Sequence, residues 1–141
     1  MIDLTKKLPL KKDARTILSL RPDQNILLLM PASRPQELRY ILPTFMLAAR
    51  KLQQKYPSLV VYIPSCRRAF DEIFKKAFRK YQVKGFVISQ KDNARLKPYI
   101  YSLTKISFCK SGTVNMELAL YGIPQIVGYS CLLYTSPSPR D

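Results

Sequence analysis

The stretch Asn25-Ile-Leu-Leu-Leu-Met-Pro-Ala-Ser-Arg-Pro-Gln-Glu37 decides the fold. It begins with an apolar run that stops at Pro31, and such a run is typical of a strand buried on both faces of a parallel sheet. From residue 37 to residue 56, apolar side chains recur mostly at spacings of three and four. This spacing predicts an amphipathic helix with a bend at Pro43. A buried strand followed directly by a helix is the first half of a βαβ unit.

The same alternation continues along the chain. Further strands are predicted at 59–63, 86–89, 106–109 and 125–129, and further helices at 12–20, 69–81, 93–101 (interrupted by Pro98) and 114–121. Strands that alternate with helices in this way form right-handed βαβ units around a parallel sheet. The sequence therefore predicts one α/β domain over residues 1–130, with helices on both faces of a sheet of about five strands.

Composition excludes several kinds of chemistry. The chain has 141 residues, 24 Lys and Arg against 9 Asp and Glu, and no His. Catalytic arrangements of the Ser-His-Asp or Cys-His type therefore cannot be built within it. The net charge of +15 predicts an anionic partner, which would be a phosphate, a nucleic acid or a membrane surface.

The sequence predicts a cytoplasmic protein, with peripheral contact to a membrane as an option. No apolar run approaches the roughly 20 residues of a spanning helix, and the first residues do not resemble a signal peptide. The three cysteines, Cys66, Cys109 and Cys131, show no CxxC spacing and no disulfide framework, which fits a reducing compartment. We expect two of them, Cys66 and Cys109, to be buried small hydrophobic residues.

The last residues, Cys131-Leu-Leu-Tyr-Thr-Ser-Pro-Ser-Pro-Arg-Asp141, differ abruptly from those before them. They read, codon for codon, as the translation of a transposase-type sequencing adaptor. We expect residues 131–141 to be an artefactual, disordered tail and Ser130 to replace a native arginine. The alternative is a Ser/Pro-rich linker.

Two loops are predicted at the carboxyl ends of strands, where ligands bind in α/β sheets. In the first, Ser33 and Arg34 precede a helix whose free N–H groups favour an anion. The second contains Ser111-Gly112-Thr113, in which the glycine lets backbone amides approach a phosphate. Glu117 lies one helical turn beyond this loop, where its carboxylate can accept hydrogen bonds from the two hydroxyls of a ribose.

Each of these residues also has an ordinary explanation. Ser111 or Thr113 would serve equally well as a helix N-cap, and Glu117 as a solvated helix residue. Arg34 and Glu37 would form a surface pair within one helical turn. Neither loop matches GxGxxG or a Walker P-loop, so the residues by themselves predict only an anion-binding α/β domain.

Two longer motifs resemble a known family. Met30-Pro-Ala-Ser-Arg-Pro-Gln-Glu37, followed by a helix with Leu42-Pro-Thr-Phe and Ala48-Ala49, resembles the LPGSRxxE…P…aa pattern of the lipid-A-disaccharide synthases. The segment from Lys110-Ser-Gly-Thr to Val127-Gly-Tyr resembles their SGTxxxE…L…P.VV.YR signature, in the same order and spacing. The resemblance covers residues 23–129.

Three positions depart from the family pattern. Ala32 replaces the usual glycine of GSR, Lys105 replaces an acidic residue that often opens the fourth strand, and no arginine follows Tyr129. The first two departures affect how the donor would be positioned.

The resemblance implies the nucleotide-binding, Rossmann-like half of a GT-B glycosyltransferase. Such an enzyme transfers a diacylated glucosamine from its UDP donor to an acylated glucosamine 1-phosphate with inversion, and needs no metal or other cofactor. By motif, Ser33, Arg34 and Ser111-Gly112-Thr113 would contact the diphosphate, and Glu117 the ribose. The catalytic carboxylate belongs to an N-terminal domain, so the chain is expected to be an internal fragment that is inactive alone.

The resemblance also implies three partners and leaves two alternatives. The partners are the UDP-sugar donor, the missing N-terminal domain and an anionic membrane surface, where each Lys or Arg adds on the order of 1 kcal/mol. One alternative is another UDP-sugar enzyme of GT-B fold.

The other alternative is a basic nucleic-acid-binding module, suggested by the charge and by the basic run over residues 67–84. No RRM, KH or helix-turn-helix signature supports it. The aromatic residues of this run lie at core spacing, which predicts inward positions for Phe70, Ile73, Phe74, Ala77 and Phe78.

Overall fold

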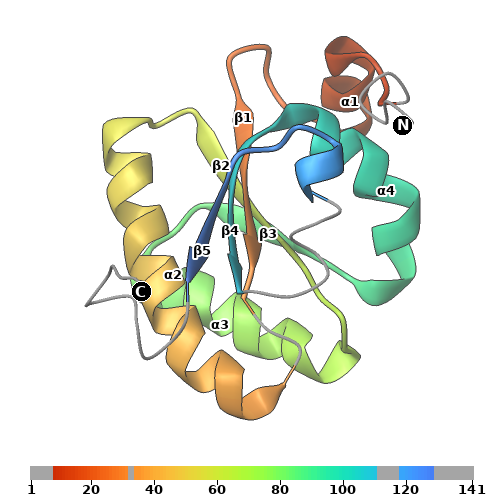
Figure 1. Ribbon diagram of the computed structural model, residues 1–141. Coiled ribbons are helices and arrows are strands. Elements are labelled where there is room, and N and C mark those ends of the chain that lie inside the picture. The colour runs from red at the N-terminus through yellow and green to blue at the C-terminus, as the bar shows by residue number, and fades with distance from the viewer. Residues whose placement is uncertain (1–7, 32–33, 111–117, 129–141) are drawn as a thin grey trace.

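The computed structural model describes residues 8–31, 34–110 and 118–128 (Figure 1). Helices and strands alternate along it, as the sequence predicts. Their bounds are α1 (Lys11–Leu18), β1 (Asn25–Met30), α2 (Pro35–Lys55), β2 (Leu59–Pro64), the 3₁₀ helix η2 (Arg68–Phe70), α3 (Asp71–Tyr81), β3 (Gly85–Ile88), α4 (Gln90–Leu103), β4 (Thr104–Lys110) and β5 (Gln125–Gly128).

The five strands form one parallel sheet in the order β3-β2-β1-β4-β5. The apolar run of β1 therefore lies at the centre, where Ile26 to Leu29 are completely buried. Its last residue, Met30, is paired with Cys109 of β4, so the carboxyl ends of these two strands are neighbours. The predicted parallel sheet of about five strands is confirmed.

Helices cover both faces of the sheet. Leu27 and Leu29 of β1 pack in one core cluster with residues of α2 and α3, whereas Ile26 and Leu28 pack in a second cluster with residues of α1 and α4. This alternation follows from the period of two along a strand. In Figure 1, α2 and α3 accordingly lie on one side of the sheet and α1 and α4 on the other.

Two small residues hold the strands at close range. Ser107 of β4 is completely buried, and its hydroxyl lies 3.0 Å from the carbonyl oxygen of Leu28, to which it donates a hydrogen bond. Gly85 of β3 lies so close to β2 that a Cβ atom would be 2.2 Å from the carbonyl oxygen of Val61. A larger side chain at residue 85 would therefore collide with backbone.

The structure corrects three predictions. The helix α4 is not interrupted at Pro98, because Ile100, Tyr101 and Leu103 beyond it are buried against the sheet and the missing N–H removes only one hydrogen bond. Ile73 is 45% exposed rather than inward, since it lies on the outer side of α3. Cys66 is exposed because it lies in the loop after β2, while Cys109 is buried as expected.

Candidate functional site

The strand order creates a switch point between β1 and β4. From β1 the chain proceeds through β2 to β3 on one side, and it then returns through α4 to β4 on the other side. The connecting helices therefore diverge to opposite faces beyond the carboxyl ends of β1 and β4. In open α/β sheets this crevice is where ligands bind.

The helix α2 begins at this crevice. Arg34 is its N-cap residue, in an extended conformation (φ −114°, ψ 139°), and its exposed side chain makes no capping hydrogen bond. Pro35 occupies the first helical turn, where its missing N–H removes no helical hydrogen bond. The remaining free amides and the guanidinium together favour an anion at this end of the helix.

An ion pair joins the first turn of α2 to the end of β4. The Nζ atom of Lys110 lies 2.5 Å from Oε2 of Glu37, and each side chain is only about 30% exposed. Glu37 thus pairs across the crevice with Lys110 rather than within its own turn with Arg34, as one sequence alternative had it. The pair fixes the residue that precedes Ser111 beside the start of α2.

The second carboxylate oxygen of Glu37 is a further feature of this site. Oε1 is buried and has no hydrogen-bond partner among the described residues. A buried acceptor without a partner is unfavourable by about 1–3 kcal/mol, more for a charged group. An incoming N–H or O–H group would therefore gain from binding to this atom.

The structure places the predicted site residues only in part. Arg34 lies at the predicted edge of the sheet, while Ser33, Ser111-Gly112-Thr113 and Glu117 lie outside the described residues. Arg34, which follows Ser33, and Lys110, which precedes Ser111, both lie at the carboxyl edge of the sheet. A shared anion site requires this arrangement. Sequence reasoning gave Lys110 no role, although its place directly after a strand and before the second motif could have suggested one.

A carboxylate, Asp92, lies at the carboxyl edge of the sheet after β3. After β3, Asp92 accepts hydrogen bonds from Arg95 (3.2 Å) and from the Ser89 hydroxyl (3.1 Å). The hydrogen bond from Arg95, and then that from Ser89, lowers the pKa of Asp92. The charge of this carboxylate is therefore compensated by Arg95, with which it forms an ion pair.

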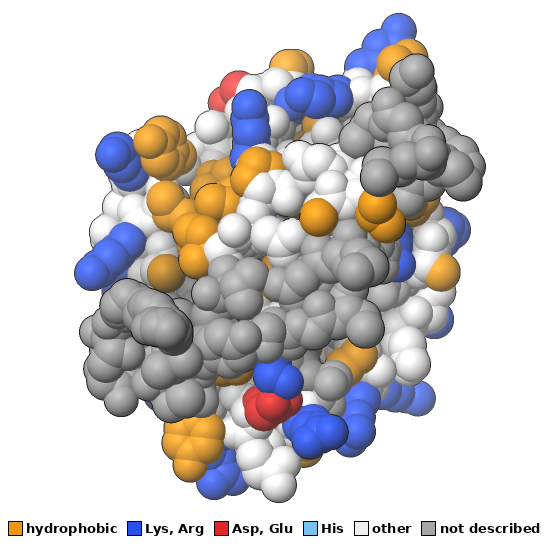
Figure 2. All heavy atoms as spheres, viewed as in Figure 1, with side chains coloured by type: hydrophobic (Ala, Val, Ile, Leu, Met, Phe, Trp, Pro, Cys, Tyr) orange, Lys and Arg blue, Asp and Glu red, His pale blue; other side chains and the backbone are white. Residues whose placement is uncertain are grey.

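On the face that Figure 2 shows, cationic side chains outnumber acidic ones, and the described residues contain no group that could hold a metal ion. Figure 2 shows Lys and Arg side chains around the rim of one face with few acidic groups between them. Within the described part of the chain, no three His, Cys, Asp or Glu residues are grouped to hold a metal ion. Nor does that part contain a helix long and apolar enough to cross a membrane.

The basic run on α3 lacks the stacking platform of a nucleic-acid site. Phe70, Phe74 and Phe78 are buried in the core beneath the basic side chains, and the ring of Tyr81 is covered by Lys80 at 5.4 Å. Single-stranded nucleic acids are bound through aromatic rings that lie exposed in a basic groove. The basic run on α3 therefore supports this alternative by charge alone.

Comparison with known proteins points to one family. The family model described as "Lipid-A-disaccharide synthetase" matches residues 1–135. The chain is 45% identical over 129 residues to "Lipid-A-disaccharide synthase" of Prochlorococcus marinus, and 33% identical over 129 residues to that of Gloeothece citriformis. These matches cover 92% of the chain but only 33% and 32% of the relatives, so the chain spans about a third of their length.

A solved structure resembles the fold alone. "Structure of the Wall Teichoic Acid Polymerase TagF" matches 82% of this chain and 27% of that chain, with a TM-score of 0.54 and 14% sequence identity. At this identity the likeness shows the fold alone, a parallel α/β sheet with helices on both faces.

Proposed function

Because the chain belongs to the lipid-A-disaccharide synthetase family, we propose that its crevice binds the UDP part of a UDP-sugar donor. The single observation that carries this proposal is the meeting of Arg34, the start of α2 and Lys110 at the switch point of the sheet. A diphosphate placed there would face the Arg34 guanidinium, the free amides of a helix N-terminus and Lys110, whose charge is shared with Glu37.

We extend this proposal to specific contacts with the nucleotide, some of them made by residues that the structure does not describe. Ser33 and Arg34 would contact the diphosphate from one side and the amides of Ser111-Gly112-Thr113 from the other. Glu117 would accept hydrogen bonds from the ribose. The open Oε1 atom of Glu37 offers one further acceptor at the same place.

The donor we propose is UDP-2,3-diacylglucosamine, and the acceptor is an acylated glucosamine 1-phosphate. The domain would stabilise the departing UDP through these contacts, while an N-terminal domain supplies the acceptor site and the catalytic carboxylate. We therefore propose that the 141-residue chain has no measurable turnover by itself, and that residues 131–141 are an artefactual tail attached to a nucleotide-binding domain of residues 1–130.

The lipid nature of the proposed substrates indicates where in the cell the protein would act. A cytoplasmic protein with a charge of +15 is attracted to an anionic bilayer, where such substrates reside. We propose peripheral binding to the cytoplasmic face of a membrane.

Calorimetric titration with UDP tests the nucleotide site. The chain should bind UDP, and Arg34→Ala should weaken binding roughly tenfold or more, since a charge-assisted hydrogen bond is lost. Arg79→Ala, which removes an exposed arginine on α3, is the matched control and should leave UDP affinity unchanged. Glu117→Ala should also weaken binding.

The same titration with a short DNA duplex at two salt concentrations tests the alternative. Steeply salt-dependent duplex binding without any heat from UDP would contradict the proposal and favour a nucleic-acid module. Measurable sugar transfer by the chain alone would contradict the proposed dependence on a second domain.

A further inference from the structure

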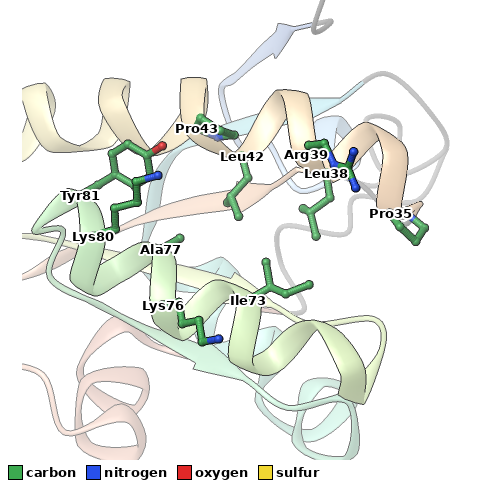
Figure 3. A pocket seen from close by; sticks show the side chains of 10 residues that line it. All are labelled: Pro35, Leu38, Arg39, Leu42, Pro43, Ile73, Lys76, Ala77, Lys80 and Tyr81. Atoms are coloured by element: carbon green, nitrogen blue, oxygen red, sulfur yellow. The ribbon is translucent and has the colours of Figure 1, made fainter.

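A groove lies between α2 and α3 on the outer side of the domain (Figure 3). Its volume is about 460 Å³, which falls within the roughly 300–1,000 Å³ of sites that bind small molecules. Leu38, Leu42 and Ala77 form its buried apolar floor. Ile73, the residue that core spacing placed inside, lines the groove with 45% of its surface exposed.

Cations line the edges of this groove. Arg39 comes from α2, and Lys76 and Lys80 come from α3; all three are exposed. None of the ten lining residues is acidic. The groove therefore combines an apolar floor with an uncompensated positive rim, and it is complementary to a molecule with an apolar chain and an anionic head.

We propose that the groove between α2 and α3 binds an acyl chain of an anionic phospholipid in a bilayer, with the phosphate held among Arg39, Lys76 and Lys80. Size favours a lipid over an acidic partner protein. A stable protein interface uses roughly 20–30 residues on each side, whereas ten residues line this groove.

The groove also has a defined direction relative to the candidate nucleotide site. Pro35 lines one end of it, directly after Arg34, and Tyr81 at the C-terminus of α3 lines the other. Lipid bound in the groove would therefore place the outer face of α2 and α3 against the bilayer, with the carboxyl edge of the sheet at the Pro35 end. This inference rests on the proposed function, because it assigns a specific site to the proposed membrane contact. Its test does not depend on UDP binding.

Co-sedimentation with vesicles measures how much the cationic rim of the groove contributes to membrane binding. We expect the chain to partition onto phosphatidylglycerol vesicles and not onto phosphatidylcholine vesicles. Reversing Lys76 and Lys80 together, to Glu, should weaken partition roughly tenfold or more. Reversing Lys11 and Lys12 on α1, to Glu, changes the net charge by the same amount on the opposite face of the sheet and should have a much smaller effect.

A second pair of variants tests how much the apolar lining of the groove contributes to vesicle binding. Ile73→Ser should weaken vesicle binding severalfold, whereas Ile17→Ser should not, although Ile17 on α1 is equally exposed (49%). Equal losses for both members of either pair would overturn the inference, because binding would then follow overall charge or general hydrophobicity. Binding of an acidic amphipathic peptide in place of vesicles would overturn it as well.

Calorimetry with UDP on the same variants separates the two proposals. If vesicle binding is insensitive to the groove variants while UDP still binds, the lipid inference fails alone. If UDP does not bind while the groove variants lose vesicle binding as expected, the proposed nucleotide site fails alone. Far-UV circular dichroism confirms that the variants, all at exposed positions, remain folded.

Discussion

The ion pair between Glu37 and Lys110 should be coupled energetically. The two side chains approach to 2.5 Å and are each about 30% exposed. Exposed ion pairs contribute about 0–1 kcal/mol, and hydrogen bonds to charged groups that are shielded from water about 1.5–3 kcal/mol. The intermediate burial of this pair therefore predicts a coupling free energy of about 1–2 kcal/mol.

A double-mutant cycle measures this coupling. Urea unfolding of the original chain, Glu37→Gln, Lys110→Met and the double variant gives four free energies of unfolding, whose non-additivity is the coupling term. The pair Glu72 and Lys75 on α3 is the matched control, since its atoms are 3.7 Å apart and its side chains are 71% and 53% exposed. It should give about 0.5 kcal/mol or less.

The same variants connect stability to the site. Lys110→Met should also weaken UDP binding, because it removes a cation from the crevice, whereas Lys75→Met should not. A coupling below about 0.3 kcal/mol for Glu37 and Lys110, equal to that of the control pair, would refute the reasoning that this contact joins the start of α2 to the end of β4.

Three further predictions concern the sheet and the thiols. Gly85→Ala should lower the free energy of unfolding by about 2–3 kcal/mol in urea titrations, because its Cβ would lie 2.2 Å from the carbonyl oxygen of Val61; an unchanged midpoint would contradict this. Burial raises the pKa of Tyr62 to about 12. The unfolded chain therefore loses this proton first, so stability present below pH 10 should fall by up to about 2–3 kcal/mol as the pH rises to 12, and Tyr62→Phe should flatten that decline. Iodoacetamide should label Cys66 in the folded protein and spare Cys109, whose burial raises its thiol pKa; mass spectrometry of the peptides distinguishes the two.

Local patterns were sufficient to predict most of the fold. The strand β1 has the bounds expected from its apolar run, because a strand buried on both faces needs apolar residues at every position. The order of the strands was not predicted, since a parallel sheet has several possible orders. The pairing of β1 with β4 depends on contacts between residues far apart in sequence.

Departures from prediction arose where position within the fold overrides local preference. Proline at residue 98 predicts a helix break, but burial of the following turn outweighs one lost hydrogen bond. Ile73 has core spacing, yet it is 45% exposed and lines the groove between α2 and α3. The contact of Glu37 with Lys110 could not be predicted, because it requires the register of two strands and the start of a helix to be known together.

The central position of β1 has a consequence for the chain as it leaves the ribosome. The hydrogen bond from Ser107 to Leu28 spans 79 residues, so one side of β1 has no strand partner until β4 has been synthesised. At about 5–20 residues per second, that interval lasts roughly 4–16 s. During this interval the nascent chain exposes its most apolar strand along one edge, and the crevice between β1 and β4 does not yet exist.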